Sequence, residues 1–347
     1  MARRKSNRAY PKRKKRQKGK AVRYPSNRHG GTLFAALCAA VLLCIAGVIA
    51  SEHSLPMLDI SAVSQSAEQL DLYEKNSACV VEPADVGETQ LHFISVGQGD
   101  ATLIAQDGAY ALIDAGVSTA TDDLLSYLHS LDIETIEVLV MTHPHSDHIG
   151  AMDEIIAEFE IETIILPQFD LSDELPTSTS FSNVLAAIEQ SDATICVAEV
   201  GASYAVGSGT LTIVSAGIET DNLNDISVST LFAAGDFSLL CTGDAEEAQE
   251  QAMLESGVSL HATVFQAGHH GSSTSNTLAF LQAVQPEFVV ISCGLDNSYG
   301  HPHQSVLENY AAVGADYYRT DLDGTVVITY TAQDGIQVLC TQEQEAA

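Results

Sequence analysis

Short apolar runs alternate with helical patterns from residue 90 onward, and this alternation predicts a layered α/β domain. In the first half, the β-type segments LHFISVG, ATLIAQ and YALIDAG are broken by Gly or Asp-Gly turns, and IEVLVMT and TIILP follow. Between them, apolar positions at helical spacing predict helices over 119–131, 149–159 and 181–190.

The second half of the chain repeats this arrangement. Its predicted strands are TLTIVSA, SVSTLFAA, FSLLCTG, ATVFQAG and FVVISCG, and its predicted helices lie near 245–256, 275–284 and 304–313. A final pair of strands, YYRTD and GTVVITYT, is expected before a short terminal strand. Two strand-rich halves that each carry helices predict stacked layers of sheet and helix. The sequence has no GxGxxG motif and no P-loop, so a nucleotide cofactor is not expected.

The first 50 residues have a different character. Residues 1–28 hold 13 of the 15 lysines and arginines and no acidic residue. Residues 32–50 carry no charge, and as a helix they would reach about 28 Å, close to the hydrocarbon thickness of a bilayer. Because cations favour the cytoplasmic side, the prediction is a basic cytoplasmic tail (1–31), a transmembrane helix (32–50), an acidic stalk (51–89) and an exported domain (90–341).

A cleaved signal peptide competes with the membrane anchor, because Val48-Ile49-Ala50 satisfies the small-residue pattern before a cleavage site. Both interpretations export the acidic body, which is either extracellular at the cell membrane or secreted. Beyond the tail, two basic residues, Lys75 and Arg319, stand against 46 acidic ones, a formal charge of −44. The body therefore lacks the basic surface that supplies most affinity for nucleic acid.

The strongest chemical signal is the segment THPHSDH (142–148), at a predicted strand-to-helix junction. Alternate residues of an extended loop point the same way, so His143 and His145 can bind one metal ion. Asp147 and His148 lie at the turn into the helix, where they can bind a second ion. Imidazoles combined with a carboxylate suit zinc, and also iron or manganese. Two such ions, about 3.5–4 Å apart, can share a hydroxide and hold the oxygens of a substrate.

The HxHxDH pattern after an apolar strand resembles the signature of metallo-β-lactamase-fold hydrolases, and the resemblance covers residues 90–341. Further segments resemble one branch of them, the C-terminal hydrolase domain of ComEC-type competence proteins; these are VGQGD, GDFSLLCTGDAE, HHGS, YGHPH and YRTDLDGT. The resemblance implies a four-layer αββα sandwich behind the N-terminal helix. It also implies a site for two divalent metal ions, zinc or alternatively manganese or iron.

The resemblance also assigns roles to single residues. It implies that Asp114 of LIDAG braces the ligands through hydrogen bonds, that Asp244 bridges both metals, and that one of His269 and His270 is a ligand, with His270 favoured. The implied metal ligands are His143, His145, Asp147, His148, Asp244 and His270. The implied catalytic residues are Asp147, Asp244, His269, His301 and His303.

Other residues carry weaker expectations. Gln98 and Asp100 lie in a Gly-bounded loop, where they either support the ligands or form a turn. Arg319 either forms a structural ion pair or contacts an anionic substrate. A further ligand histidine, usual in the fold between the first cluster and the bridging acid, is missing, and Asn224 or Asp225 is expected in its place.

The expected function is that of a membrane-anchored or secreted hydrolase, in which a hydroxide bound by two metal ions attacks phosphodiester bonds. The negative charge favours a small or exposed phosphoester over extended duplex DNA, without excluding the latter. Two alternatives stay open. One is a non-catalytic extracellular module that binds metal or a partner, and the other is a hydrolase of another ester or of a lactam.

Overall fold

The computed structural model describes residue 81 and residues 83–169 and 176–342. The predicted basic tail, the apolar segment and most of the acidic stalk lie outside these residues, so those expectations stay predictions. Within the described ranges, none of the helices combines the length and the apolar character that crossing a bilayer requires.

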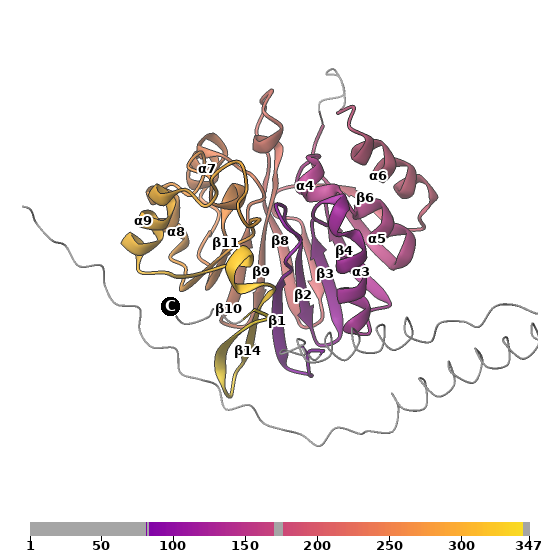
Figure 1. The fold of residues 1–347 in the computed structure, drawn as a ribbon, viewed down its shortest axis with the longest axis horizontal. Helices are drawn as coiled ribbons and strands as arrows, with labels where there is room; N and C mark the ends of the chain where they lie inside the picture. Colours follow the sequence, from indigo (N-terminus) through magenta and orange to yellow (C-terminus); the bar gives the residue numbers. More distant parts are fainter. Residues whose placement is uncertain (1–80, 82, 170–175, 343–347) are drawn as a thin grey trace, which may run out of the picture. The chain divides into compact units, whose positions relative to one another are not determined.

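Two sheets form the centre of the described domain (Figure 1). The first sheet has the strand order β15-β14-β1-β2-β3-β4-β5-β6. Its strands are β1 (Glu88–Phe93), β2 (Thr102–Gln106), β3 (Ala109–Ile113), β4 (Thr135–Val140), β5 (Glu160–Leu166), β6 (Thr194–Val197), β14 (Val326–Thr331) and β15 (Gly335–Cys340). Strands β3 to β6 are parallel, and β1 pairs antiparallel with both β2 and β14.

The second sheet has the order β13-β12-β11-β10-β9-β8-β7. Its strands are β7 (Ser203–Val206), β8 (Gly209–Ala216), β9 (Val228–Ala234), β10 (Phe237–Cys241), β11 (Val264–Gln266), β12 (Phe288–Ile291) and β13 (Asp316–Arg319). Strands β10 to β13 are parallel, whereas β7, β8 and β9 form an antiparallel meander that continues into β10.

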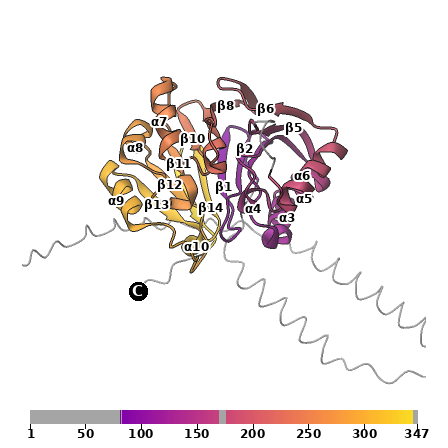
Figure 2. The same cartoon turned by 90° about the horizontal axis from the view of Figure 1, so that it is seen from above.

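Helices cover the outer face of each sheet, as the view from above shows (Figure 2). The first sheet carries α3 (Thr121–Ser130), α4 (Ser146–Ile149), α5 (Met152–Glu158) and α6 (Thr179–Gln190), and the second carries α7 (Glu247–Ser256), α8 (Leu278–Val284) and α9 (Gln304–Val313). Short turns of helix are η1 (Ser118–Ala120), η2 (Leu223–Ile226), η3 (Gly268–Gly271) and α10 (Thr320–Asp323).

The side chains of single strands show how the layers are held together. In β2, Leu103 packs into the core beneath the helices, and the next residue, Ile104, packs into the core between the two sheets. Leu139 and Val140 in β4 divide in the same way. Because successive side chains point to opposite faces, a strand that is buried on both faces reads as a continuous apolar run. The predicted αββα sandwich is therefore confirmed.

The two predicted final strands and the terminal strand β15 all form, but the two final strands do not pair with each other. YYRTD becomes β13, which joins β12 in the second sheet, whereas GTVVITYT becomes β14, which joins β1 in the first. The turn α10 and Gly324, at φ 67°, carry the chain from one sheet to the other. The sequence patterns also missed β6 and β7, which lie at the ends of the two sheets.

Candidate metal centre

The candidate ligands lie in loops that leave the carboxyl ends of parallel strands. Asp114 directly follows β3, and the 142–148 segment follows β4, its parallel neighbour. In the second sheet, Asp244 follows β10, and the 268–271 turn follows β11. Since parallel strands end at the same edge of a sheet, these loops gather there, where ligand sites of open α/β sheets are commonly found.

Unusual backbone geometry brings the loops into contact. Gly243 has φ 55°, and a Cβ atom at this position would lie 2.8 Å from Cβ of Thr142, so only glycine lets the two loops approach so closely. Asp114 has φ 58°, and the adjacent His269 and His270 have φ 49° and 55°. Side chains other than glycine rarely adopt this left-handed region, and such residues cluster at functional sites.

The buried carboxylate of Asp114 organises the first loop. It accepts hydrogen bonds from the backbone N–H of Thr142 (2.9 Å) and from the Thr142 hydroxyl (2.6 Å). Its Oδ2 also faces Nδ1 of His148 at 2.6 Å. The proton of His148 is therefore held at Nδ1, which leaves the lone pair of Nε2 directed into the site.

A first group of ligand atoms comprises His143, His145 and Asp244, all within 4.8 Å of one another. Nε2 of His143 lies 3.0 Å from Nδ1 of His145 and 3.6 Å from Oδ2 of Asp244. Two nitrogens bound tetrahedrally to one zinc ion are roughly 3.3 Å apart, so the spacing of this pair suits a shared cation.

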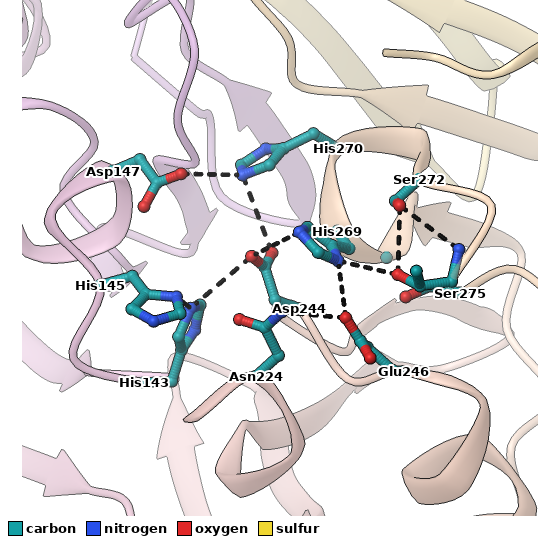
Figure 3. Close-up of polar contacts among 12 residues, drawn as sticks. His143, His145, Asp147, Asn224, Asp244, Glu246, His269, His270, Ser272 and Ser275 are labelled. Atoms are coloured by element: carbon teal, nitrogen blue, oxygen red, sulfur yellow. Dashed lines mark hydrogen bonds and ion pairs between the residues drawn. The ribbon is translucent and has the colours of Figure 1, made fainter. Parts of the chain in front are cut away.

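A second group comprises Asp100, His148, Asp244 and His270, all buried. Oδ1 of Asp244 lies 3.1 Å from Nε2 of His148 and 3.8 Å from Nε2 of His270. Nδ1 of His270 donates to the carbonyl of Ser292 (3.0 Å), which leaves its Nε2 free to act as a ligand. Asp244 thus belongs to both groups and lies at the centre of the site (Figure 3).

Asp147 lies beside the second group. Its Oδ2 is 3.5 Å from Nε2 of His270, and its side chain is partly exposed towards the pocket. The structure therefore brings together all six residues that the resemblance assigned as ligands. It adds Asp100 to them, a residue for which the sequence left a supporting role and a turn as equal options.

The ionisable groups strongly perturb one another. Burial lowers the pKa of His143 well below its usual value. Burial has the same tendency at His148, but the charges of Asp244 and Asp114 outweigh it and raise that pKa well above the usual value. At His270 burial is likewise outweighed, by Asp244 and Asp100, and the pKa rises to about 9. Burial tends to raise the pKa of Asp244, but the neighbouring histidines hold it well below the usual value.

The donor set fits divalent metal ions. Nε2 of His148, Nε2 of His270, Oδ1 of Asp244 and both carboxylate oxygens of Asp100 are buried without a hydrogen-bond partner among the described residues. Buried polar atoms are normally paired, and unpaired ones require an explanation. Imidazole nitrogens and carboxylate oxygens that converge on two neighbouring positions have the chemistry of a two-metal centre.

A pocket of about 330 Å³ opens beside these ligands. Its lining residues are Gln98, His145, Ser146, Asp147, Asn224, Asp244, His269, His270, Tyr299 and His301. His269 is partly exposed there, with Nε2 3.5 Å from Oδ2 of Asp244. His301 follows β12, and its Nδ1 is buried without a hydrogen-bond partner among the described residues. Burial, followed by the charge of His270, lowers the pKa of His301 to about 4.

The two candidates for the missing histidine point in different directions. Both carboxylate oxygens of Asp225 are bonded away from the pocket, to the Glu246 N–H (2.8 Å) and to the Asn222 amide (3.2 Å). Asn224 lines the pocket, and its NH₂ group donates to Glu246 at 3.0 Å. This bond turns the amide oxygen of Asn224, which is buried and unpaired, towards the side of the site that holds His143 and His145 (Figure 3).

Three other residues predicted from the sequence belong to neither group of ligand atoms. His303 accepts a hydrogen bond from the Ser273 N–H (2.8 Å) and does not line the pocket. Arg319 forms two hydrogen bonds to Asp321, at 2.9 and 2.6 Å, and is a structural ion pair. Gln98 lines the pocket and accepts a bond from the Gly294 N–H.

Sequence reasoning missed two residues of the site. Glu246 orients Asn224, and its Oε1 lies 3.4 Å from Nδ1 of His269. Tyr299 lies exposed at the pocket, with its ring stacked on His301 at a centroid distance of 5.6 Å. The signal for Tyr299 was its place in the YGHPH segment, whereas no pattern singled out Glu246.

Comparison with known proteins finds one family and several similar chains. A model of the metallo-beta-lactamase superfamily matches residues 94–170. ComE operon protein 3 of Bacillus subtilis is 26% identical over 274 residues, which cover 74% of this chain and 35% of the relative. Recombination protein 2 of Haemophilus influenzae is 30% identical over 255 residues, covering 72% of this chain and 30% of the relative. The solved structure of CmlA, a diiron beta-hydroxylase from Streptomyces venezuelae, has a TM-score of 0.47 at 14% identity, covering 74% of this chain and 55% of that one.

The fold, the ligand loops and the matched residues define a metallo-beta-lactamase superfamily domain, a class whose members are generally metal-dependent hydrolases. Three curated relatives, ComE operon protein 3, Competence protein ComA of Neisseria gonorrhoeae and Recombination protein 2, are ComEC-type competence proteins. The chain spans about a third of the length of these relatives.

Proposed function

We propose that this protein is a hydrolase of phosphodiester bonds that uses two divalent metal ions, exported or held at the membrane by its N-terminal segment. One observation carries the proposal: a buried carboxylate, Asp244, belongs to two separate groups of ligand atoms at the floor of a pocket. A pair of metal ions at such positions would activate water and neutralise the charge that develops on a phosphoryl group.

The residues around the pocket would bind the metal ions and transfer protons. His143, His145, His148 and His270 would hold the ions together with the carboxylates of Asp147 and Asp244. His269 lies on the open side of Asp244, where its imidazole can give a proton to a leaving oxygen. His301, with a pKa of about 4, is neutral near pH 7, so it suits accepting a hydrogen bond from substrate or water better than donating a proton.

Charge narrows the class of substrate. Residues 81–342 contain no lysine and a single arginine, Arg319, whose guanidinium is bonded to Asp321. A long polyanion would therefore meet no basic groove, which supplies most of the affinity in nucleic-acid complexes. The proposal favours small or exposed phosphodiesters, held through the metals. Because the relatives are named for competence and recombination, DNA belongs in the test beside small esters.

Hydrolysis of bis(p-nitrophenyl) phosphate by the full chain, freed of metal and then reloaded, tests the proposal. We expect turnover that depends on two ions per chain and falls at least about 100-fold in Asp244→Asn, because the shared ligand is lost. Single-stranded and duplex DNA, a p-nitrophenyl carboxylate ester and a chromogenic lactam complete the panel. Two bound ions with no cleavage of any phosphodiester would contradict the proposal and favour a non-catalytic metal-binding module.

A further inference from the structure

The buried carboxylate of Asp100 has no hydrogen-bond partner in the part of the chain that the structure describes. Its residue is only 1% exposed, and neither Oδ1 nor Oδ2 has a hydrogen-bond partner among the described residues. Burying such a group without partners costs several kcal/mol, because it loses the hydrogen bonds that water would provide. Among the described residues, no other carboxylate has both oxygens buried without a hydrogen-bond partner. A cation or a hydrogen-bond donor must therefore satisfy the Asp100 oxygens.

Among the described residues, no lysine or arginine side chain satisfies the Asp100 oxygens. The single arginine of residues 81–342 is engaged with Asp321, and lysine does not occur in that range. The neighbouring imidazole N–H groups are engaged as well. Nδ1 of His270 lies 3.8 Å from Asp100 but donates to the Ser292 carbonyl at 3.0 Å. Nδ1 of His148 faces Asp114. Asp100 is therefore not the group that orients either ligand ring.

The backbone nevertheless fixes Asp100 firmly against the ligand loops. Its N–H donates to the carbonyl of Asp147 (3.1 Å), and its own carbonyl accepts from the Gly116 N–H (2.7 Å). The preceding Gly99 approaches so closely that a Cβ atom there would lie 2.4 Å from the Asp147 carbonyl oxygen. The glycines of the VGQGD segment thus allow this turn to press a carboxylate into the floor of the site.

We propose that Asp100 is a direct ligand of the second metal ion, alongside His148, Asp244 and His270. This inference rests on the two-metal site of the proposed function and specifies its coordination. Its basis is geometric: one ligand atom from each of these four residues lies within 4.8 Å of the others. A dication at that point would satisfy the Asp100 oxygens, as well as the unpaired Nε2 atoms of His148 and His270.

The substitution Asp100→Asn in the full chain tests the inference, with Asp323→Asn as the matched control. Asp323 is equally buried (1% exposed), but it accepts a hydrogen bond from the Arg319 N–H and belongs to neither ligand group. Zinc is titrated into each metal-free chain against a chromophoric chelator, and bound metal is counted by mass spectrometry. The melting temperature of each metal-free chain is recorded as well.

We expect Asp100→Asn to bind the first zinc ion as the unchanged chain does and the second about 100-fold more weakly, a loss at the upper end of what changes near a metal site cause. Its metal-free melting temperature should stay close to that of the unchanged chain, because no hydrogen bond to Asp100 is lost and the nearest imidazole nitrogen, Nδ1 of His270, lies 3.8 Å away. Asp323→Asn should keep both affinities.

Two results would overturn the inference. If Asp100→Asn retains both zinc affinities within about threefold, a buried water satisfies Asp100 instead. If its metal-free melting temperature falls together with its zinc binding, the fold itself needs the carboxylate. The proposed function fails separately, when a chain that holds both ions cleaves no phosphodiester.

Discussion

The substitution Asp114→Asn is the most informative change to the candidate site, because it alters one atom and leaves the backbone intact. Asp114 has φ 58°, a region that asparagine also tolerates, so the turn itself is kept. Oδ1 of the new side chain can still accept the Thr142 N–H. The amide NH₂, however, replaces the oxygen that faces both the Thr142 hydroxyl and Nδ1 of His148.

The expected magnitude follows from the tautomer of His148. With an N–H donor opposite Nδ1, the imidazole is stabilised with its proton on Nε2, the atom that would bind metal. Changes to such supporting carboxylates typically cost 10- to 100-fold in metal affinity, about 1.4–2.7 kcal/mol. The loss should fall on the second ion, since His143 and His145 do not contact Asp114 directly.

Zinc titration of the metal-free full chain against a chromophoric chelator measures both affinities. Asp132→Asn is the matched control, because Asp132 has φ 56°, is exposed and belongs to neither ligand group. The control should behave like the unchanged chain. Equal second-ion affinities in Asp114→Asn and Asp132→Asn would refute the idea that Asp114 fixes the tautomer of His148.

Three further predictions concern pH, packing and the first metal. Folding raises the pKa of His270 from 6.5 to about 9, so protonated His270 contributes stability to the metal-free chain that is fully present below pH 6.5 and is lost as pH rises through 9. The melting temperature of the metal-free chain should therefore fall between pH 6.5 and 9, and a rise would contradict this. Gly243→Ala would place a Cβ atom 2.8 Å from Thr142, so its free energy of unfolding in urea should fall by about 2–3 kcal/mol. In the control Gly235→Ala, the new Cβ meets no atom within 4 Å, and the φ of 61° alone should cost about 1–2 kcal/mol. Equal losses in the two variants would contradict the close approach at Gly243. Asn224→Ala should weaken the first zinc ion about tenfold in the chelator assay, and an unchanged affinity would show that the amide oxygen is not used.

Most of the candidate site could be predicted because its residues lie in a few short segments of the sequence. His143, His145, Asp147 and His148 lie within six residues, and strand periodicity alone places them at the end of a buried strand. Asp244 and His270 likewise end apolar strands of the second half, and parallel pairing brings them to the same edge. Continuous apolar runs such as LVM and SLLC predicted strands that are buried on both faces, and the layers of the fold followed from these strands.

What could not be predicted depends on tertiary packing. β6 was missed because its alternating side chains are largely exposed, so it lacks the apolar signal of a buried strand. The partition of β13 and β14 between two sheets depends on the turn at Gly324, which the two apolar runs do not encode. Asp100 follows a glycine, which suggests a turn as readily as a ligand, and only the folded chain shows its carboxylate buried among imidazoles.

The metal content of the full chain tests the central claim most directly. Metal-free protein is reloaded with zinc, manganese or iron and counted by mass spectrometry, beside Asp244→Asn. The shared position of Asp244 predicts about two ions per unchanged chain, with loss of bound metal in the variant. No bound metal after loading with any of the three, or two ions retained in Asp244→Asn, would contradict a two-metal centre built around Asp244.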